Sequence, residues 1–173
     1  MTSRRAFTLI ELLVTIAIIG ILASFTMVAI GRVKHMSRST ACINNLRQIG
    51  IALQVYLEES NNCFPTLANR SSTNDPNPAI DTVLLRGSGG NVFRCPADIR
   101  RVFETTGTSY YWNFTINGQE LNNIYSVVGG SDLTRVPILC DKEGFHAELR
   151  DKVNTLYGDC HAERQISFTV DLP

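Results

Sequence analysis

The chain has 173 residues, 44% of them hydrophobic, and its 16 basic and 16 acidic side chains leave a formal net charge of zero. This length allows one apolar anchor and one domain of about 110 residues, a common domain size. Binding to nucleic-acid phosphates needs a basic surface, and the charge balance excludes a strongly basic field. We therefore expect no nucleic-acid partner.

Residues 7–30 form an apolar run with one ionisable side chain, Glu11, directly after the basic pair Arg4 and Arg5. About twenty apolar residues, each rising about 1.5 Å, cross the ~30 Å hydrocarbon core of a bilayer. The run therefore predicts a membrane-spanning helix, with the arginines cytoplasmic and the remainder exported. The alternative is an ordinary secretory signal peptide, which has a shorter apolar region and a small-residue cleavage site at its far end.

Glu11 is unusual because a carboxylate in a single membrane helix costs roughly 2.5 kcal/mol or more near the bilayer centre, and less towards its edge. No other side chain of the run can neutralise it. Cleavage after Ala6 would give Phe7 a positively charged α-amine one helical turn from this carboxylate. The pair could close within one chain or between neighbouring chains of a filament.

Residues 4–14, RRAFTLIELLV, resemble the leader and mature start of type IV pilins and type II secretion pseudopilins. The resemblance implies cleavage between Ala6 and Phe7 by a prepilin peptidase, N-methylation of Phe7, and a filament-assembly role for Glu11. It implies three kinds of partner: the peptidase, copies of this chain or other pseudopilins, and inner-membrane lipid. Most members have Gly at the position of Ala6. Ala is the next smallest side chain, so we expect the peptidase to cleave more slowly rather than not at all. Many members have Pro at the position of Val28, and that Pro helps the helix loosen inside filaments. Because this chain has Val there, the resemblance does not imply such loosening.

Beyond the apolar run, the pattern becomes amphipathic through residues 31–59, with apolar residues at three- to four-residue spacing. These apolar positions are Leu46, Ile49, Leu53, Tyr56 and Leu57. We expect one helix from residue 7 to about residue 59, roughly 80 Å long, whose second half packs on a domain. Gly50 could let a strand or loop approach closely. The SNN sequence at residues 60–62 and Pro65 end the helix.

The remainder is predicted to form a globular head rich in β-strands. The candidate strands are residues 108–116, 125–128, 136–140, 153–157 and 162–170, and residues 81–85 could be a short helix or strand. The last two strands flank residues 158–161 and could form a hairpin. The fold class is therefore α+β: a long N-terminal helix packed against a C-terminal antiparallel sheet, as the pilin resemblance also implies. The predicted parts are a leader at 1–6, a transmembrane or filament-core helix at 7–30, its amphipathic continuation at 31–59 and the head at 60–173.

Several segments beyond the membrane anchor are similar to a pseudopilin-like family abundant in planctomycetes and verrucomicrobia. They are C-x-N-N-L-R-Q-I-G from Cys42 to Gly50, Phe64-Pro65, FRCPAD ending at Asp98, Ser109-Tyr110 with Asn113, and Leu156-Tyr157-Gly158-Asp159. The closing motif of that family usually reads Asp-Gly-His, and here Cys160 replaces the Gly. Many members have a His nine residues before this motif; the nearest candidate here, His146, has twelve residues between.

Five cysteines lie on the side predicted to be exported: Cys42, Cys63, Cys95, Cys140 and Cys160. A periplasm-like compartment permits disulfides, and an odd number leaves at least one thiol free or paired between chains. The sequence does not assign their connectivity. Zinc sites prefer closely spaced pairs such as C-x-x-C, which the chain lacks, so no metal site is predicted.

Residues of the head suggest two kinds of chemistry, thiol hydrolysis and calcium binding. Cys160-His161, with His146 nearby in sequence, suggests a thiol hydrolase, but adjacency in sequence supplies neither the hydrogen-bond geometry nor an oxyanion site. The major pseudopilins of type II secretion bind calcium in a C-terminal loop. Here the candidate oxygen ligands lack the regular spacing of a calcium loop: Asp132, Asp141, Asp159 and Glu163.

The sequence thus favours a non-enzymatic subunit of a type II secretion pseudopilus or a type IV pilus-like filament. Before assembly it would span the inner membrane once, with its head in the periplasm or outside the cell. One alternative is a membrane-anchored monomer whose head is a binding module or an enzyme; another is a minor pilin of a type IV pilus or DNA-uptake system. Four basic or histidine residues after the anchor run against the positive-inside bias, but the cleavage site outweighs them: Arg32, Lys34, His35 and Arg38.

Overall fold

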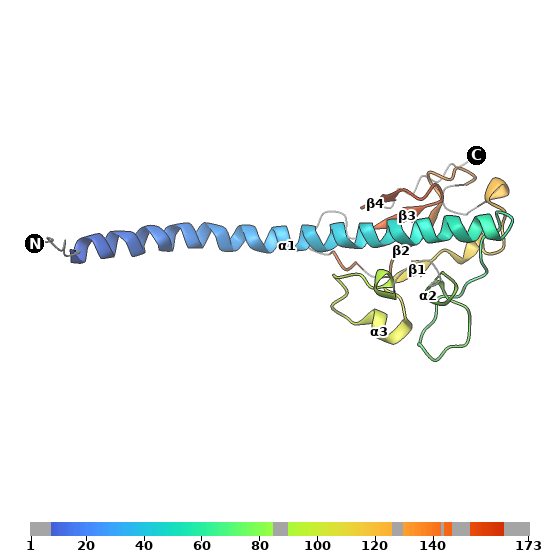
Figure 1. Ribbon diagram of the computed structural model, residues 1–173, viewed down its shortest axis with the longest axis horizontal. Helices are drawn as coiled ribbons and strands as arrows, with labels where there is room; N and C mark the ends of the chain where they lie inside the picture. Colours follow the sequence, from blue (N-terminus) through green and yellow to red (C-terminus); the bar gives the residue numbers. More distant parts are fainter. Residues whose placement is uncertain (1–7, 85–89, 126–129, 143, 147–152, 165–173) are drawn as a thin grey trace, which may run out of the picture. The chain divides into compact units, whose positions relative to one another are not determined.

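A computed structural model describes residues 8–84, 90–125, 130–142, 144–146 and 153–164 (Figure 1). The chain divides into two compact units, residues 1–34 and residues 35–173. From Leu9 onward, the described part of the first unit is one stretch of helix. The second contains the rest of that helix, the sheet and the short helices.

Helix α1 runs from Leu9 to Glu59, close to the bounds that the sequence pattern predicts. In the first unit the large apolar side chains that the structure describes are exposed, from 48% at Val14 to 81% at Leu9. The most apolar 18-residue window has a mean hydropathy of 2.6, and by length and composition the helix can cross a membrane. So much contiguous apolar surface is not stable in water and needs lipid or other apolar helices around it.

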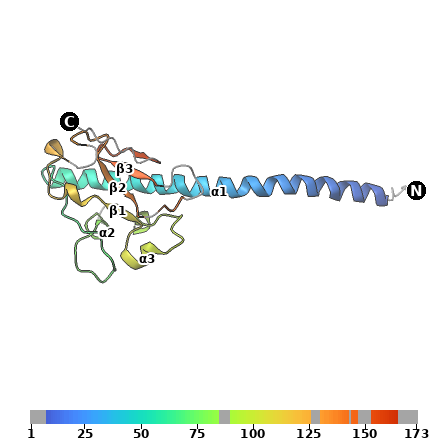
Figure 2. The ribbon, with the colours of Figure 1, turned by 180° about the vertical axis from the view of Figure 1, so that it is seen from behind.

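In the second unit, one face of α1 packs into the apolar core of the head. Leu46, Ile49 and Leu53 are at most 1% exposed and belong to one apolar cluster with residues of the sheet. Figure 2 shows β1, β2 and β3 beside this part of the helix. The prediction for Gly50 is confirmed, because a Cβ at this position would come within 3.2 Å of Leu156 Cδ1. The glycine thus lets the sheet pack close to the helix.

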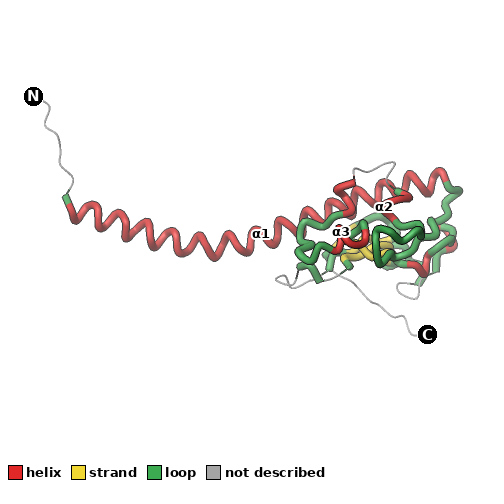
Figure 3. Tube along the Cα trace, turned by 90° about the horizontal axis from the view of Figure 1, so that it is seen from below, coloured by secondary structure: helices red, strands yellow, loops and turns green. Residues whose placement is uncertain are grey.

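The sheet has four antiparallel strands in the order β1-β2-β3-β4, drawn in yellow in Figure 3. The strands are β1 Tyr110–Trp112, β2 Pro137–Asp141, β3 Thr155–Tyr157 and β4 Ala162–Glu163. Leu139 in β2 pairs with Leu156 in β3, which in turn pairs with Ala162 in β4. All three residues are buried, so this row of the sheet contributes to the core.

The predicted strand at 136–140 and the predicted hairpin are confirmed as β2 and as the β3–β4 pair, although residues 165–170 lie outside the described chain. The short element predicted at 81–85 is helix α2, Ile80–Val83. Residues 126–128 of another predicted strand also lie outside the described residues.

The prediction of a continuous strand at 108–116 is wrong in its second half. After β1 the chain forms the 3₁₀ helix η2, Phe114–Ile116, because the side chain of Asn113 accepts a hydrogen bond from Thr115 N at 3.1 Å. An asparagine that caps the following turn in this way competes with strand pairing.

The sequence pattern did not predict three short helices in the segment that begins at residue 90. These are η1 Gly90–Phe93, α3 Val102–Thr106 and η3 Leu121–Asn123. Helix α3 begins where the carboxylate of Asp98 accepts the backbone N–H groups of Val102 at 3.0 Å and Phe103 at 2.8 Å. Such a carboxylate satisfies donors that a helix start otherwise leaves unpaired.

Candidate functional site

The carboxylate of Glu11 lies in the first turn of α1, where Thr8 holds it in place. Its Oε2 accepts hydrogen bonds from Thr8 N and Thr8 Oγ1, both at 2.8 Å, while Glu11 N donates to Thr8 Oγ1 at 3.3 Å. This reciprocal arrangement is a capping box, which satisfies two backbone donors at a helix start. Glu11 therefore has polar partners within its own chain. The sequence reasoning missed them, although the Thr-x-x-Glu spacing was the available signal.

The two residues of the expected cleavage site, Ala6 and Phe7, lie outside the described residues. The described helix begins two residues after Phe7, at Leu9. Glu11 is thus close in sequence to the expected new amino terminus.

Of the five cysteines, Cys42 and Cys95 form a disulfide, with their Cα atoms 5.1 Å apart. Cys63, Cys140 and Cys160 are free. The disulfide joins α1 to the loop that follows η1 and closes a sequence separation of 53 residues. It is fully inside the core, since both cysteines are at most 1% exposed.

A buried polar network surrounds the ring of His146. Its Nε2 lies 2.8 Å from Asn154 Nδ2, 3.4 Å from Asp141 Oδ2 and 3.8 Å from Cys95 Sγ. Asp141 Oδ2 also accepts from Asn154 N at 2.8 Å, and Ser39 Oγ donates to Asn154 Oδ1 at 3.2 Å. Burial raises the pKa of Asp141, and the neighbouring ring of His146 is the largest opposing effect. The network ties β2 and β3 to the inner face of α1.

Residues 1–27 match the family model described as "Prokaryotic N-terminal methylation motif". The chain carries the methylation motif typical of type IV pilins and pseudopilins. No curated protein and no solved structure matches the chain.

The motif implies processing by a prepilin peptidase, and together with the apolar helix it is consistent with an inner-membrane anchored prepilin. The described fold is a pilin-like α+β fold, in which helix Leu9–Glu59 packs against a four-stranded antiparallel sheet. The assignment to planctomycetes or verrucomicrobia has no support from these matches.

The thiol-hydrolase alternative finds no catalytic geometry among the described residues. Cys160 Sγ lies against Gly50 O at 3.5 Å, and burial raises the pKa of this thiol to about 11. The ring of His161 instead stacks on Tyr157, with centroids 4.5 Å apart, and is hydrogen-bonded to Asp159. A nucleophilic cysteine needs a lowered pKa and a base in contact.

Cys160 has a backbone φ of +66°, in the left-handed region. Glycine adopts this conformation at no steric cost, whereas other residues rarely do. This is a physical reason for the glycine that the resembling family usually has at this position.

The four acidic residues considered for calcium have different surroundings. Asp132 Oδ1 accepts hydrogen bonds from Thr134 N and Oγ1, as in a turn, and Asp141 is buried beside His146. Asp159 pairs with His161, and Glu163 Oε1 lies 3.9 Å from the same ring. They do not form a group of oxygen ligands in the described part of the chain.

Proposed function

We propose that the protein is a structural, non-enzymatic subunit of a type II secretion pseudopilus or a type IV pilus-like filament. One observation carries this proposal: the methylation motif at residues 1–27 continues into a helix whose large apolar side chains have no protein partner in the described chain. Pilin-like families are generally non-enzymatic. On this proposal residues 1–6 are the leader, 7–30 the filament core, 31–59 its amphipathic continuation and 60–173 the head.

Glu11 would set the position of each incoming subunit. Cleavage after Ala6 would create a cationic α-amine on Phe7, and the separate N-methylation step would leave it cationic. The capping box with Thr8 supports this role, because it holds the carboxylate at the amino-terminal end of the helix and supplies donors while no amine is present. In an apolar environment an ion pair between Glu11 and a neighbour's amine is far stronger than in water. A subunit at another axial position along the filament would leave both charges unpaired, which is costly.

The amino terminus gives the first test. Mass spectrometry of the protein from its native envelope should find a chain that starts at N-methylated Phe7. An intact Met1 would contradict the proposal and favour the membrane-anchored monomer, whose head would then be the functional part.

The second test replaces Glu11 by Gln or Ala. Both variants should insert into the membrane but fail to enter filaments, because the carboxylate that pairs with the amine is missing. Glu58→Gln is the matched control, since Glu58 is an exposed carboxylate at the other end of the same helix. Normal filament incorporation of the Glu11 variants would remove the assembly role of this residue.

A further inference from the structure

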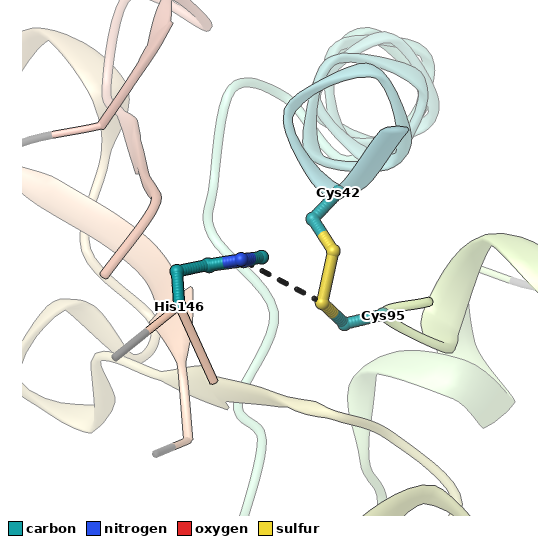
Figure 4. A group of neighbouring side chains, drawn as sticks. All are labelled: Cys42, Cys95 and His146. Carbon is teal, nitrogen blue, oxygen red and sulfur yellow. Dashed lines mark hydrogen bonds between the residues drawn. A yellow bond between two sulfur atoms is a disulfide. The ribbon is translucent and has the colours of Figure 1, made fainter. Parts of the chain in front are cut away.

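Three side chains that commonly bind metals meet in the core of the head: Cys42, Cys95 and His146 (Figure 4). Each offers one ligand atom, and these three atoms all lie within 4.8 Å of one another. The side chains come from α1, from the loop after η1 and from the chain after β2, and none is more than 3% exposed. Thiolate sulfur and imidazole nitrogen are preferred ligands of zinc.

We propose that Cys42 and Cys95, when they are thiols rather than a disulfide, bind one Zn²⁺ ion together with His146. Binding transfers no electrons: each thiol loses its proton to solvent, and two zinc–sulfur bonds form. A newly made chain has both thiols before any oxidant acts on it. The disulfide and the zinc ion are therefore alternative ways to join α1 to the loop after η1.

The hydrogen bonds of His146 suit a metal ligand. The amide nitrogen of Asn154 can only donate, so His146 Nε2 accepts this bond with its single lone pair. A zinc ion would take the place of the Asn154 N–H at that lone pair. The orientation of the amide is fixed because Asn154 Nδ2 also donates to Asp141 Oδ2 at 3.0 Å, an oxygen that already accepts the backbone N–H of Asn154. The nitrogen nearest to the sulfur of Cys95 is thus the one without a proton.

Asp141 places a carboxyl group beside the same nitrogen, with Oδ2 at 3.4 Å. Its second oxygen, Oδ1, is buried and has no hydrogen-bond partner among the described residues. A divalent cation, or a water bound to it, would supply the missing partner. Asp141 is not one of the three grouped ligands, so its place would be beside the ligand His146 rather than on the metal.

The geometry requires only small movements. Zinc lies about 2.3 Å from thiolate sulfur and about 2.0–2.1 Å from imidazole nitrogen, so ligand atoms around it are less than about 4 Å apart. Reduction of the disulfide lets the two sulfurs move apart, and His146 Nε2 already lies 3.8 Å from Cys95 Sγ. The absence of a C-x-x-C pair argued against zinc from the sequence, but folding brings together cysteines that are 53 positions apart.

The test uses the full-length chain in detergent with Cys63, Cys140 and Cys160 replaced by Ser, which leaves only the two thiols of interest. We expect the reduced chain to retain one zinc ion per molecule by elemental analysis, and the oxidised chain to retain none. Cobalt(II) in place of zinc should give a near-ultraviolet sulfur-to-cobalt charge-transfer band in the reduced chain alone. No zinc on the reduced chain, or equal zinc on both forms, would overturn the proposal.

Two histidine variants in the same background show whether the ring takes part. His146→Gln should weaken zinc binding at least about tenfold and change the visible cobalt spectrum. His161→Gln is the matched control, because this half-exposed ring lies in the β3–β4 turn, and it should leave both unchanged. An unchanged zinc affinity in His146→Gln contradicts the proposal.

The stability of the reduced chain supplies a readout that does not depend on the variants. Zinc bound only by the folded head must raise its melting temperature, followed by the fluorescence of the single tryptophan, Trp112. If reduction unfolds the head, zinc should restore this signal. A melting curve that zinc does not shift, or an unfolded reduced head that zinc does not restore, would refute the site.

Discussion

Removal of the disulfide should cost the head about 4 kcal/mol of stability. The perturbation is the double variant Cys42→Ser/Cys95→Ser, which keeps the size of both side chains and removes the covalent link. The bond closes a separation of 53 residues, and the chain-entropy model gives about 4 kcal/mol at 25 °C for a loop of that length. Most of the cost arises because the unlinked unfolded chain has more conformations.

The assay is urea unfolding of the full chain in detergent, followed by the fluorescence of Trp112, which is the only tryptophan and is 1% exposed in the core of the head. The control is Cys63→Ser, which removes a free thiol and should change the free energy of unfolding by less than about 1 kcal/mol. A loss below about 1 kcal/mol in the double variant would refute the entropy argument. A loss equal to that of the control would also contradict the disulfide as a structural link.

Three further predictions concern the head. Gly107→Ala should destabilise it by more than about 1 kcal/mol in the same urea assay, because φ is +82° there and a Cβ would lie 2.5 Å from both members of a buried arginine–aspartate ion pair. Asn117→Ala should cost about 1–3 kcal/mol, because Asn117 Oδ1 accepts the indole N–H of Trp112 at 2.7 Å; an unchanged midpoint would contradict this. Burial raises the pKa of Cys140 and of Cys160 from 9.0 to about 11. Iodoacetamide at pH 8 should therefore alkylate both thiols at least about tenfold more slowly than a model thiol peptide, with rates still rising above pH 9, and equal rates would refute the burial effect.

The same thiols predict how stability depends on pH. Their pKa values are higher in the folded chain than in the unfolded chain, so their stabilising contribution is complete below pH 9 and is lost as the pH rises towards about 11. Urea unfolding between pH 8 and pH 11 should show a smaller loss for Cys140→Ser/Cys160→Ser than for the unsubstituted chain. An identical loss would show that the thiols do not cause it.

The sequence alone determined the features that depend on local pattern. An apolar run with one carboxylate, followed by an amphipathic pattern that ends before Pro65, predicts a single long helix because helical periodicity repeats every 3.6 residues. The β3–β4 hairpin could be predicted for a similar reason, since two short apolar strands flank a turn. The motif around Glu11 is also contiguous, so the first 27 residues were sufficient to recognise it.

Tertiary structure alone decided which distant residues meet. Five cysteines allow many pairings, and only the packing of the loop after η1 against α1 selects Cys42 with Cys95. The position of His146 beside that disulfide follows from β2 and β3 closing over the helix, which no spacing in the sequence indicates. Asn113, which caps the turn after β1, is also held by a distant residue, since its Nδ2 donates to Pro137 O at 2.8 Å. Local pattern fixes the helix and its hairpin, whereas the site in the core exists only because long-range packing brings its parts together.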